Sequence, residues 1–499
     1  MNPIRSMLRI LGLKLLAFGP KDQYEGGQRW SPRRSYLNGF VRDMRFDADA
    51  ATRWELVRKS RYFERNSAIY NRIIDVWEEY TVGPSGLRIV PASSDEEWNK
   101  RATEYWNAWQ KMCDIGTRQS FGTVQSLVAR SWAVDGELFI LKTYGKDRPD
   151  KPAFPRIQLI ETHRVQSPPD EFNAPDMIDG ISIDKNGRPI FYSIKSGIGT
   201  GEKFELVEAE DVIHVFEPSR PGQYRGLPVV YPVINDLHDL DDLQILEMDA
   251  AKEAAKTTSV IHTATGEIEE EALRRARFGI GGTSGTSGGS AQERSQYYED
   301  VFEGRVKVLR PDDKYEQFQS SRPSVVTQAY WDYLTSKVCA GIGISKLLVF
   351  PWSMQGTVTR ADLDVQSAFF RSRSSVLISA FTQIYEFVMW HGTKSDRTLA
   401  DPPADWRKIN VRPPRSVNVD VGRNSSAMIA EYEAGFRTLE GICGELGDDW
   451  REVLYQRGIE RAAAKKIEKA LGLDEGELIQ AALEAIKSRR LETPEPARQ

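Results

Sequence analysis

Hydrophobic positions recur at helical spacing early in the chain and then at strand spacing. Apolar side chains three or four positions apart over 51–83 predict amphipathic helix, with a break near Asn66 and an end at Gly83-Pro84. Further helices are predicted over 95–112 and 120–135. Short apolar runs bounded by Gly, Pro and Asn186-Gly187 then predict strands over 137–144, 156–161, 180–184, 189–195 and 211–216. A helical layer followed by a β-rich layer indicates an α+β fold.

The rest of the chain is predicted to be mostly helical. A long helix over 229–257 is dense in acidic side chains. Strands are expected at TSVIHTA and over 305–311, on either side of a charged helix over 267–278 and a Gly/Ser-rich stretch over 279–291. The other predicted helices are 324–341, 360–391, 424–440, 447–471 and 474–489, with extended, Pro-rich sequence over 400–419.

A turn must separate the helices on either side of 343–359. Gly341, Gly343 and Pro351 prevent one helix from running continuously through this stretch. We expect Thr359 to cap the helix that starts at Arg360, because a Thr side chain can accept a bond from a free N–H of the first turn.

Composition and charge are those of an ordinary globular protein with several domains. The 499 residues have a formal net charge of -5, so no overall basic field attracts nucleic acid. The 12 Trp and 18 Tyr are many, and stripes such as Trp98, Tyr105 and Trp109 are expected to serve cores and contacts between subunits. The N-terminal stretch MNPIRSMLRILGLKLLAFG is interrupted by Arg9 and Lys14, which favours an amphipathic helix over a signal peptide.

The motifs of common enzymes and metal sites are missing from the sequence. Three widely spaced Cys favour a reducing compartment without a disulfide framework, and five scattered His show no metal spacing. No Walker A motif and no G-x-G-x-x-G occurs. Gly285-Thr-Ser287-Gly-Gly289 matches the G-x-S-x-G of hydrolases, but lies in a Gly/Ser run that forms neither the strand nor the helix of a nucleophile elbow. We therefore expect no enzyme activity, no cofactor and no metal, and a serine hydrolase using Ser287 ranks last.

Several stretches, in order over about 55–475, resemble the lambda-type portal proteins of tailed bacteriophages. The most specific is VFEPSRPGQYRGLPVVYPVINDLHDLDDL, whose R-P-G-Q-x-R-G-x-P core resembles the family signature. The Asp135-Gly136-Glu137 entry to a strand, the W-x-x-W of WNAWQKMCD and TRADLDVQSAFFRSR resemble further family motifs. Another head scaffold or adaptor protein, or an inactive prophage relative, is the alternative.

The resemblance implies a ring of about twelve subunits at the unique capsid vertex, with double-stranded DNA in its channel. The expected partners are the terminase large subunit, head-completion or adaptor proteins and the major capsid protein, with no membrane. It also implies this division of the chain: N-terminal arm 1–50, wing 51–228, stem helix 229–257, clip 258–323, second stem helix 324–342, tunnel loop 343–359, long wing helix and return strands 360–420, and helical crown and tail 421–499.

Two groups of basic residues are candidates for contacts. In the channel, Lys346, Lys252 and Lys256 are the candidates for DNA phosphates. In the clip, Arg274, Arg275 and Arg277 are the candidates for terminase and adaptor contacts, because charges at a rim set association rate and specificity. For the apolar residues of 345–357 two alternatives stay open: part of the segment faces the channel, or the apolar run packs under the wing.

Overall fold

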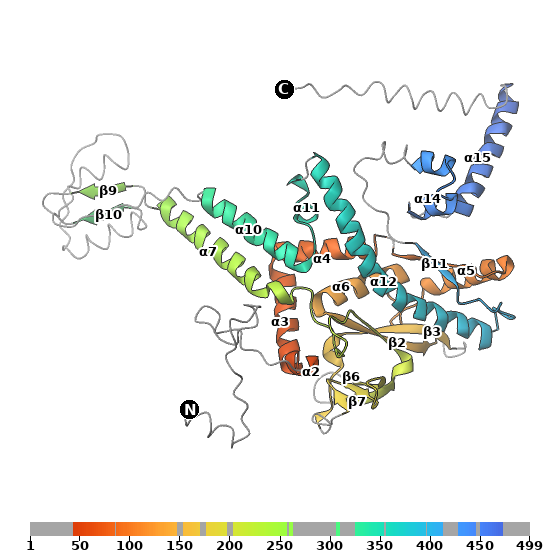
Figure 1. Cartoon of the computed structure of the whole chain (residues 1–499), viewed down its shortest axis with the longest axis horizontal. Coiled ribbons are helices and arrows are strands. Elements are labelled where there is room, and N and C mark those ends of the chain that lie inside the picture. Colours follow the sequence, from red (N-terminus) through yellow and green to blue (C-terminus); the bar gives the residue numbers. More distant parts are fainter. Residues whose placement is uncertain are drawn as a thin grey trace, which may run out of the picture.

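A computed structural model places an α+β body beside a projecting helical hairpin (Figure 1). It describes residues 43–84, 86–146, 153–169, 176–196, 203–256, 259–262, 306–309, 325–353, 356–395, 397–412, 428–445 and 450–472. The α+β prediction is confirmed. The N-terminal helix, the helices 267–278 and 474–489 and the Gly/Ser-rich stretch predicted from the sequence lie outside these residues.

The first layer of the body is helical. It consists of α2 (Met44–Asp47), α3 (Ala50–Asn66), α4 (Ala68–Thr81), α5 (Glu96–Gln110) and α6 (Phe121–Asp135). The predicted break near Asn66 is confirmed, because Ser67 ends α3 and its side chain caps α4 by accepting a bond from the amide of Tyr70. Trp98, Tyr105 and Trp109 are buried in the core of the subunit, so the stripe serves this core.

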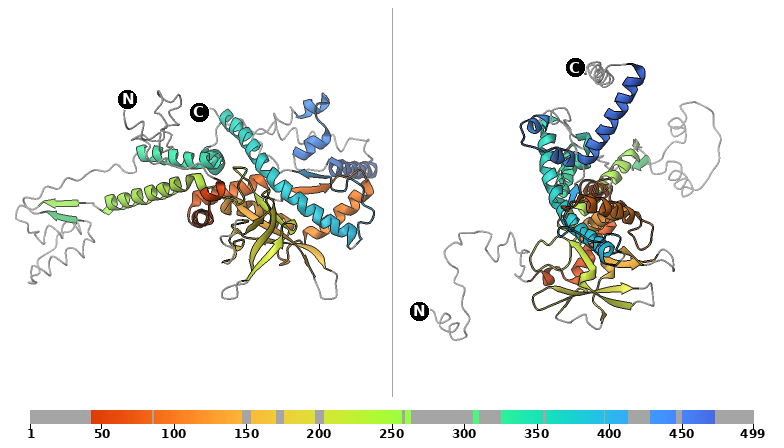
Figure 2. Two further views of the ribbon diagram at one scale, coloured as in Figure 1. Left: turned by 60° about the horizontal axis from the view of Figure 1, so that its bottom comes forward. Right: turned by 90° about the vertical axis from the view of Figure 1, so that its right-hand side faces the viewer.

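Two antiparallel sheets lie beneath the helical layer (Figure 2). In the first sheet, β2 (Glu137–Gly145) lies between β3 (Phe154–Ile160) and β8 (Val212–Phe216). The second sheet follows chain order, with β4 (Met177–Ile178), β5 (Ile181–Ile183), β6 (Pro189–Ser196) and β7 (Lys203–Glu208). The predicted turn at Asn186-Gly187 joins β5 to β6, with Gly187 at φ 82°. Strands β4 and β7 were not predicted.

A long helix and a distant strand pair complete the body. Helix α12 (Gly356–Lys394) packs its second half against the helical layer, where Phe381 and Tyr385 meet Phe121 and Trp106. Strand β1 (Arg88–Pro91) pairs with β11 (Ile409–Arg412), a pairing that the sequence did not predict. The large aromatic core is therefore built from residues of both the first and the second half of the chain.

The hairpin consists of α7 (Ile234–Lys256) and α10 (Val325–Ile342), which lie side by side in both views (Figures 1 and 2). The parallel pair of β9 (Ser259–His262) and β10 (Val306–Leu309) lies at its far end. Helix α7 begins later than residue 229, after the short 3₁₀ turn η6 (Tyr231–Val233), because Pro228 and Pro232 occupy this stretch.

The connection after α10 turns as predicted, but it is shorter than the predicted 343–359 and contains short helical elements. It contains α11 (Lys346–Val349) and the 3₁₀ turn η7 (Pro351–Ser353). The prediction that Thr359 caps a helix starting at Arg360 is wrong: α12 already begins at Gly356. Thr359 is buried within the first turns of α12, so tertiary packing outweighs the modest helix propensity of the β-branched residues 357–359.

The last described part contains α14 (Leu439–Glu445) and α15 (Trp450–Leu471). The predicted helix 447–471 matches α15. The predicted helix 424–440 is wrong as one element, because residues 428–433 are helical and the chain then turns at Gly435, whose φ is 76°. No helix in the described ranges has the length and apolar character needed to cross a membrane.

Candidate channel segment and the charge network at its base

Two stretches singled out in the sequence meet where α6 ends and β2 begins. Gly136, at φ 86°, ends α6 and lies against the backbone of Leu227. A Cβ on Gly226 would lie 2.1 Å from the carbonyl oxygen of Gly136, far inside van der Waals contact. Each glycine is therefore required by the close approach of the two backbones. The Asp-Gly-Glu motif and the R-P-G-Q-x-R-G-x-P motif form one structural unit.

Glu137 is the centre of this unit and is buried. Its carboxylate accepts bonds from Arg225 Nη2 at 2.5 Å, from the Gly226 amide at 2.7 Å and from Thr162 Oγ1 at 2.5 Å. Burial alone would raise the pKa of Glu137, but Arg225, the bond with His214 and the charge of Arg53 outweigh it and hold the pKa well below its ordinary value. Glu137 is therefore ionised.

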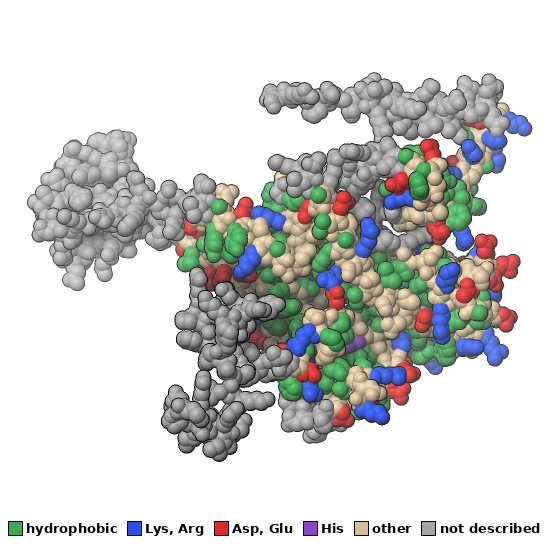
Figure 3. Space-filling model, viewed as in Figure 1, with side chains coloured by type: hydrophobic (Ala, Val, Ile, Leu, Met, Phe, Trp, Pro, Cys, Tyr) green, Lys and Arg blue, Asp and Glu red, His purple; other side chains and the backbone are tan. Residues whose placement is uncertain are grey.

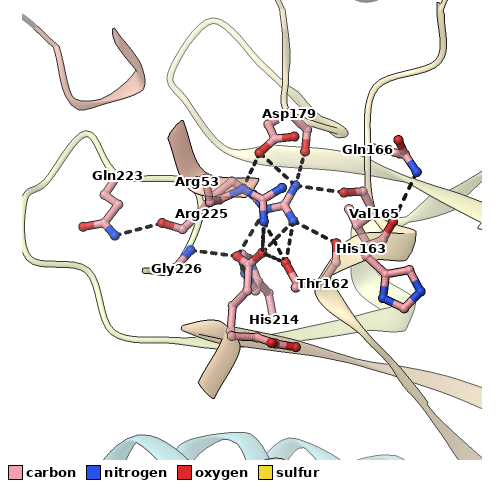
Figure 4. Close-up of polar contacts among 12 residues, drawn as sticks. Arg53, Thr162, His163, Val165, Gln166, Asp179, His214, Gln223, Arg225 and Gly226 are labelled. Carbon is pink, nitrogen blue, oxygen red and sulfur yellow. Dashed lines mark hydrogen bonds and ion pairs between the residues drawn. The ribbon is translucent and has the colours of Figure 1, made fainter. Parts of the chain in front are cut away.

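Positive and negative charges balance within the network. Arg53 Nε donates to Asp179 at 2.6 Å, and Arg225 Nη1 also lies 3.4 Å from Asp179, so two guanidinium groups face two carboxylates. Arg225 also donates to the backbone carbonyls of Val165 and Asp179 (Figure 4). A balanced, hydrogen-bonded set is the form in which charges are tolerated in a protein interior.

His214 is the imidazole of the network. Its Nε2 lies 3.0 Å from Glu137, and its ring stacks between Phe139 and Phe216, with centroids 4.3 Å and 4.2 Å away. Burial lowers the pKa of His214 more than Glu137 raises it, so the ring is neutral and donates to the carboxylate. Most polar atoms of the network bond to one another, and Arg53 Nη2 is buried without a hydrogen-bond partner. Its chemistry is that of an anchor within the fold.

The hairpin leaves the body directly beyond this anchor. Near the body, Lys337 Nζ lies 2.6 Å from Asp236, and further out Thr327 Oγ1 donates to Glu247 at 3.1 Å, so α7 and α10 are joined at two levels. The base is apolar, with Leu237 and Val338 buried. Acidic, basic and hydrophobic side chains mix on the visible face of the hairpin (Figure 3).

The structure places the candidate lysines in different surroundings. Lys346 Nζ lies 3.2 Å from Asp332 on α10, with its side chain 28% exposed. Lys252 is exposed near the far end of α7 and lies 3.2 Å from Asp249. Lys256 ends α7, and its side chain lies outside the described residues. Arg274, Arg275, Arg277 and Ser287 lie outside them as well. The candidates are not gathered into one site.

The apolar run after Lys346 divides between the core and the surface. Leu348 and Val349 are buried in the main core, as the packing alternative predicts. Trp352 instead is 79% exposed and touches only Phe350 among aromatic rings of the described residues, with centroids 5.1 Å apart. Which side chains face a channel stays a prediction.

Sequence reasoning had not singled out Arg53, Glu137, His214 or Arg225 as a cluster. They come from α3, β2, β8 and the loop before α7, so no local spacing connects them. One available signal was Glu137 at the start of the apolar run ELFIL, since a charge entering a buried strand needs partners. Among the described residues no group of three or more His, Cys, Asp or Glu could hold a metal ion. The three Cys are buried, and none forms a disulfide.

The chain thus combines an α+β body with a projecting helical hairpin, and the buried charge network lies where the two meet. Residues 38–350 match the model of the phage portal protein family of the lambda type, and the chain belongs to this family. The family is one of structural proteins rather than of enzymes.

Two curated relatives agree with this assignment. Portal protein B of Escherichia phage lambda is 24% identical over 449 residues, which cover 80% of this chain and 82% of that protein. The probable portal protein of Halomonas phage phiHAP-1 is 26% identical over 223 residues, and the match spans only 42% of its length. A subunit in the neck of an empty gene transfer agent particle aligns with 81% of this chain and 98% of its own, with 12% identity and a TM-score of 0.46. The family assignment rests on the sequence matches.

Proposed function

We propose that this chain forms the portal ring at the unique vertex of a bacteriophage capsid, the conduit through which DNA enters during packaging and leaves at ejection. Family membership carries the proposal. The projecting hairpin of α7 and α10 supports it, because such a hairpin repeated around an axis forms a tube. The acidic side chains of α7, such as Asp239 and Asp242, suit a wall past which DNA slides, since they repel phosphates rather than bind them.

The hairpin corresponds to the stem in this proposal. The pair of β9 and β10 belongs to the clip, 258–323, where the terminase large subunit docks during packaging and head-completion or adaptor proteins dock afterwards. The body forms the wing, adjoining the major capsid protein, and 421–499 forms the crown. Arg274, Arg275 and Arg277 are the proposed clip contacts. The ring functions in the virion and assembles in the host cytoplasm.

Lys346 is the proposed phosphate contact of the tunnel loop, with Lys252 and Lys256 as further channel candidates. The support is the position of Lys346 in the connection between the hairpin and α12, which also carries the exposed Trp352. Its ion pair with Asp332 is partly exposed, so it contributes little stability and can be exchanged for a phosphate.

Purified protein tests the proposal by mass photometry and by electron microscopy of particles viewed along their axis. We expect a ring of about twelve 56.6 kDa subunits with a central hole wide enough for duplex DNA. A stable monomer at micromolar concentration and physiological salt would contradict it, and would favour a scaffold or adaptor protein.

A further inference from the structure

An unusual helix end lies in the last described part of the chain. The amide of Phe436 donates to the carbonyl of Glu431, and the amide of Gly435 donates to that of Tyr432, with Gly435 in the left-handed region. This is the Schellman motif, in which the residue after the glycine normally packs back against its own helix. Phe436 does not do so, because it is 84% exposed. Ile429 and Tyr432 are exposed beside it, and we name these three residues the Phe436 patch.

Helix α15 carries a second exposed apolar surface. Leu454, Tyr455 and Ile459 lie on its first half, and Tyr455 is 74% exposed. We name these three residues the α15 stripe. Figure 3 shows hydrophobic side chains at the lower end of α15. An amphipathic helix of a globular protein normally buries its apolar stripe, so this surface lacks a partner within the described chain.

The segments that carry the Phe436 patch and the α15 stripe have opposite net charge. Residues 428–445, MIAEYEAGFRTLEGICGE, contain four acidic side chains and one basic one. Helix α15, WREVLYQRGIERAAAKKIEKAL, contains six basic side chains and three acidic ones. A surface rich in acid and apolar groups therefore complements one rich in base and apolar groups.

We infer that the Phe436 patch of one subunit docks on the α15 stripe of the next subunit. Two different surfaces that complement each other make a head-to-tail contact, and such a contact closes into a ring when the rotation between copies permits. A contact between identical surfaces would instead give a twofold dimer and would bring like charges together. The occupant of each surface is thus a second copy of this chain.

This inference rests on the proposed ring, and cysteine cross-linking tests it directly. Phe436→Cys and Tyr455→Cys chains with different tags are co-expressed and treated with a short bismaleimide. We expect a cross-linked pair that carries both tags, and no cross-linked dimer above the wild-type background when either variant is expressed alone. The wild type measures the background of the three buried native cysteines. Leu206→Cys, at an exposed site on β7, replaces Phe436→Cys as the matched control.

A second measurement is the assembly of Phe436→Ser. We expect the protein concentration at which half the chains are in rings to rise about ten-fold or more, as for an anchoring aromatic at an interface. The contact would be overturned if the wild type formed rings while the two cysteine variants gave no mixed cross-link and Phe436→Ser assembled as the wild type does. The proposed portal function would then still stand. A product from Phe436→Cys alone would overturn it in favour of a twofold contact. Wild-type protein that forms no ring would overturn both proposals.

Discussion

The buried network around Glu137 makes the effect of removing one charge calculable. Glu137→Gln keeps the size of the side chain and removes its negative charge. Arg53 and Arg225 would then share Asp179 as their only carboxylate partner in the network, leaving one uncompensated positive charge in the interior. The amide that replaces the carboxylate also presents an N–H group toward donors such as the Gly226 amide.

The expected loss is large for a change of so few atoms. Breaking a buried ion pair by removing one partner costs about 3–5 kcal/mol, mainly because the remaining charge stays buried without compensation. Since every 1.4 kcal/mol is about a factor of ten, opening of this region should become about two to three and a half orders of magnitude more frequent. The backbone amides of β2 and of the loop over 220–228 should exchange hydrogen faster by this factor.

Native-state hydrogen exchange measures this opening without requiring that the whole protein unfold reversibly. Glu205→Gln is the matched control, because Glu205 is exposed on β7 and its loss should change stability by no more than about 0.5 kcal/mol. If Glu137→Gln changed protection of β2 by less than ten-fold, the network would not be the anchor described here.

Three further changes test other parts of the structure. Gly226→Ala should lower the free energy of unfolding in urea by about 3 kcal/mol, because its Cβ would meet the Gly136 carbonyl oxygen at 2.1 Å. Gly458→Ala, with open space around it within α15, should raise that free energy by about 0.5–1 kcal/mol. Equal effects of the two changes would refute the backbone-contact argument. Burial lowers the pKa of His214 in the folded chain, so below the free-imidazole pKa of about 6.5 the unfolded chain binds more protons than the folded one. The free energy of unfolding should therefore fall as the pH falls from that value toward the lower pKa of the folded chain. His214→Gln should lose this part of the acid dependence. If the free energy of unfolding of His214→Gln depended on pH as in the wild type, this role of His214 would be contradicted. Lys346→Glu should leave the ring intact but reduce DNA retention in filled heads, since it replaces a phosphate partner with a repelling charge; unaltered retention would remove Lys346 as a channel contact.

The sequence predicted those elements whose signals are local. The break between α3 and α4 could be placed because Ser67 caps the next helix with its own side chain. The β5–β6 turn could be placed because Asn-Gly adopts a positive φ at low cost. The turn after α10 was predicted from Gly343 and Pro351.

The features that could not be predicted depend on distant or competing contacts. Strands β1 and β11 pair although more than half the chain separates them, and four-residue strands carry little pattern of their own. The start of α12 was misplaced because burial of Thr359 outweighs local propensity. The network around Glu137 was missed since its members are adjacent only after α3, β2 and β8 have packed. The family motifs contain Glu137 and Arg225, but the resemblance did not indicate that the two residues form a buried ion pair.

The position of the network explains why a buried charge cluster belongs at this point of the chain. Only the residues between Gly226 and Ile234 separate it from the start of α7, and the Val229 amide donates to the Ala133 carbonyl of α6 at 3.0 Å within this stretch. A Cβ on Gly341 of α10 would meet Val233 at 2.2 Å, so both helices of the hairpin are held against the same short connection. A purely apolar contact would tolerate sliding, because hydrophobic burial has no preferred direction. Charged hydrogen bonds do have one, so the fork of Arg225 on Glu137 fixes the direction in which the hairpin leaves the body. In the proposed portal ring, this is the connection at which a change in the direction of the hairpin would alter the proposed channel in every subunit.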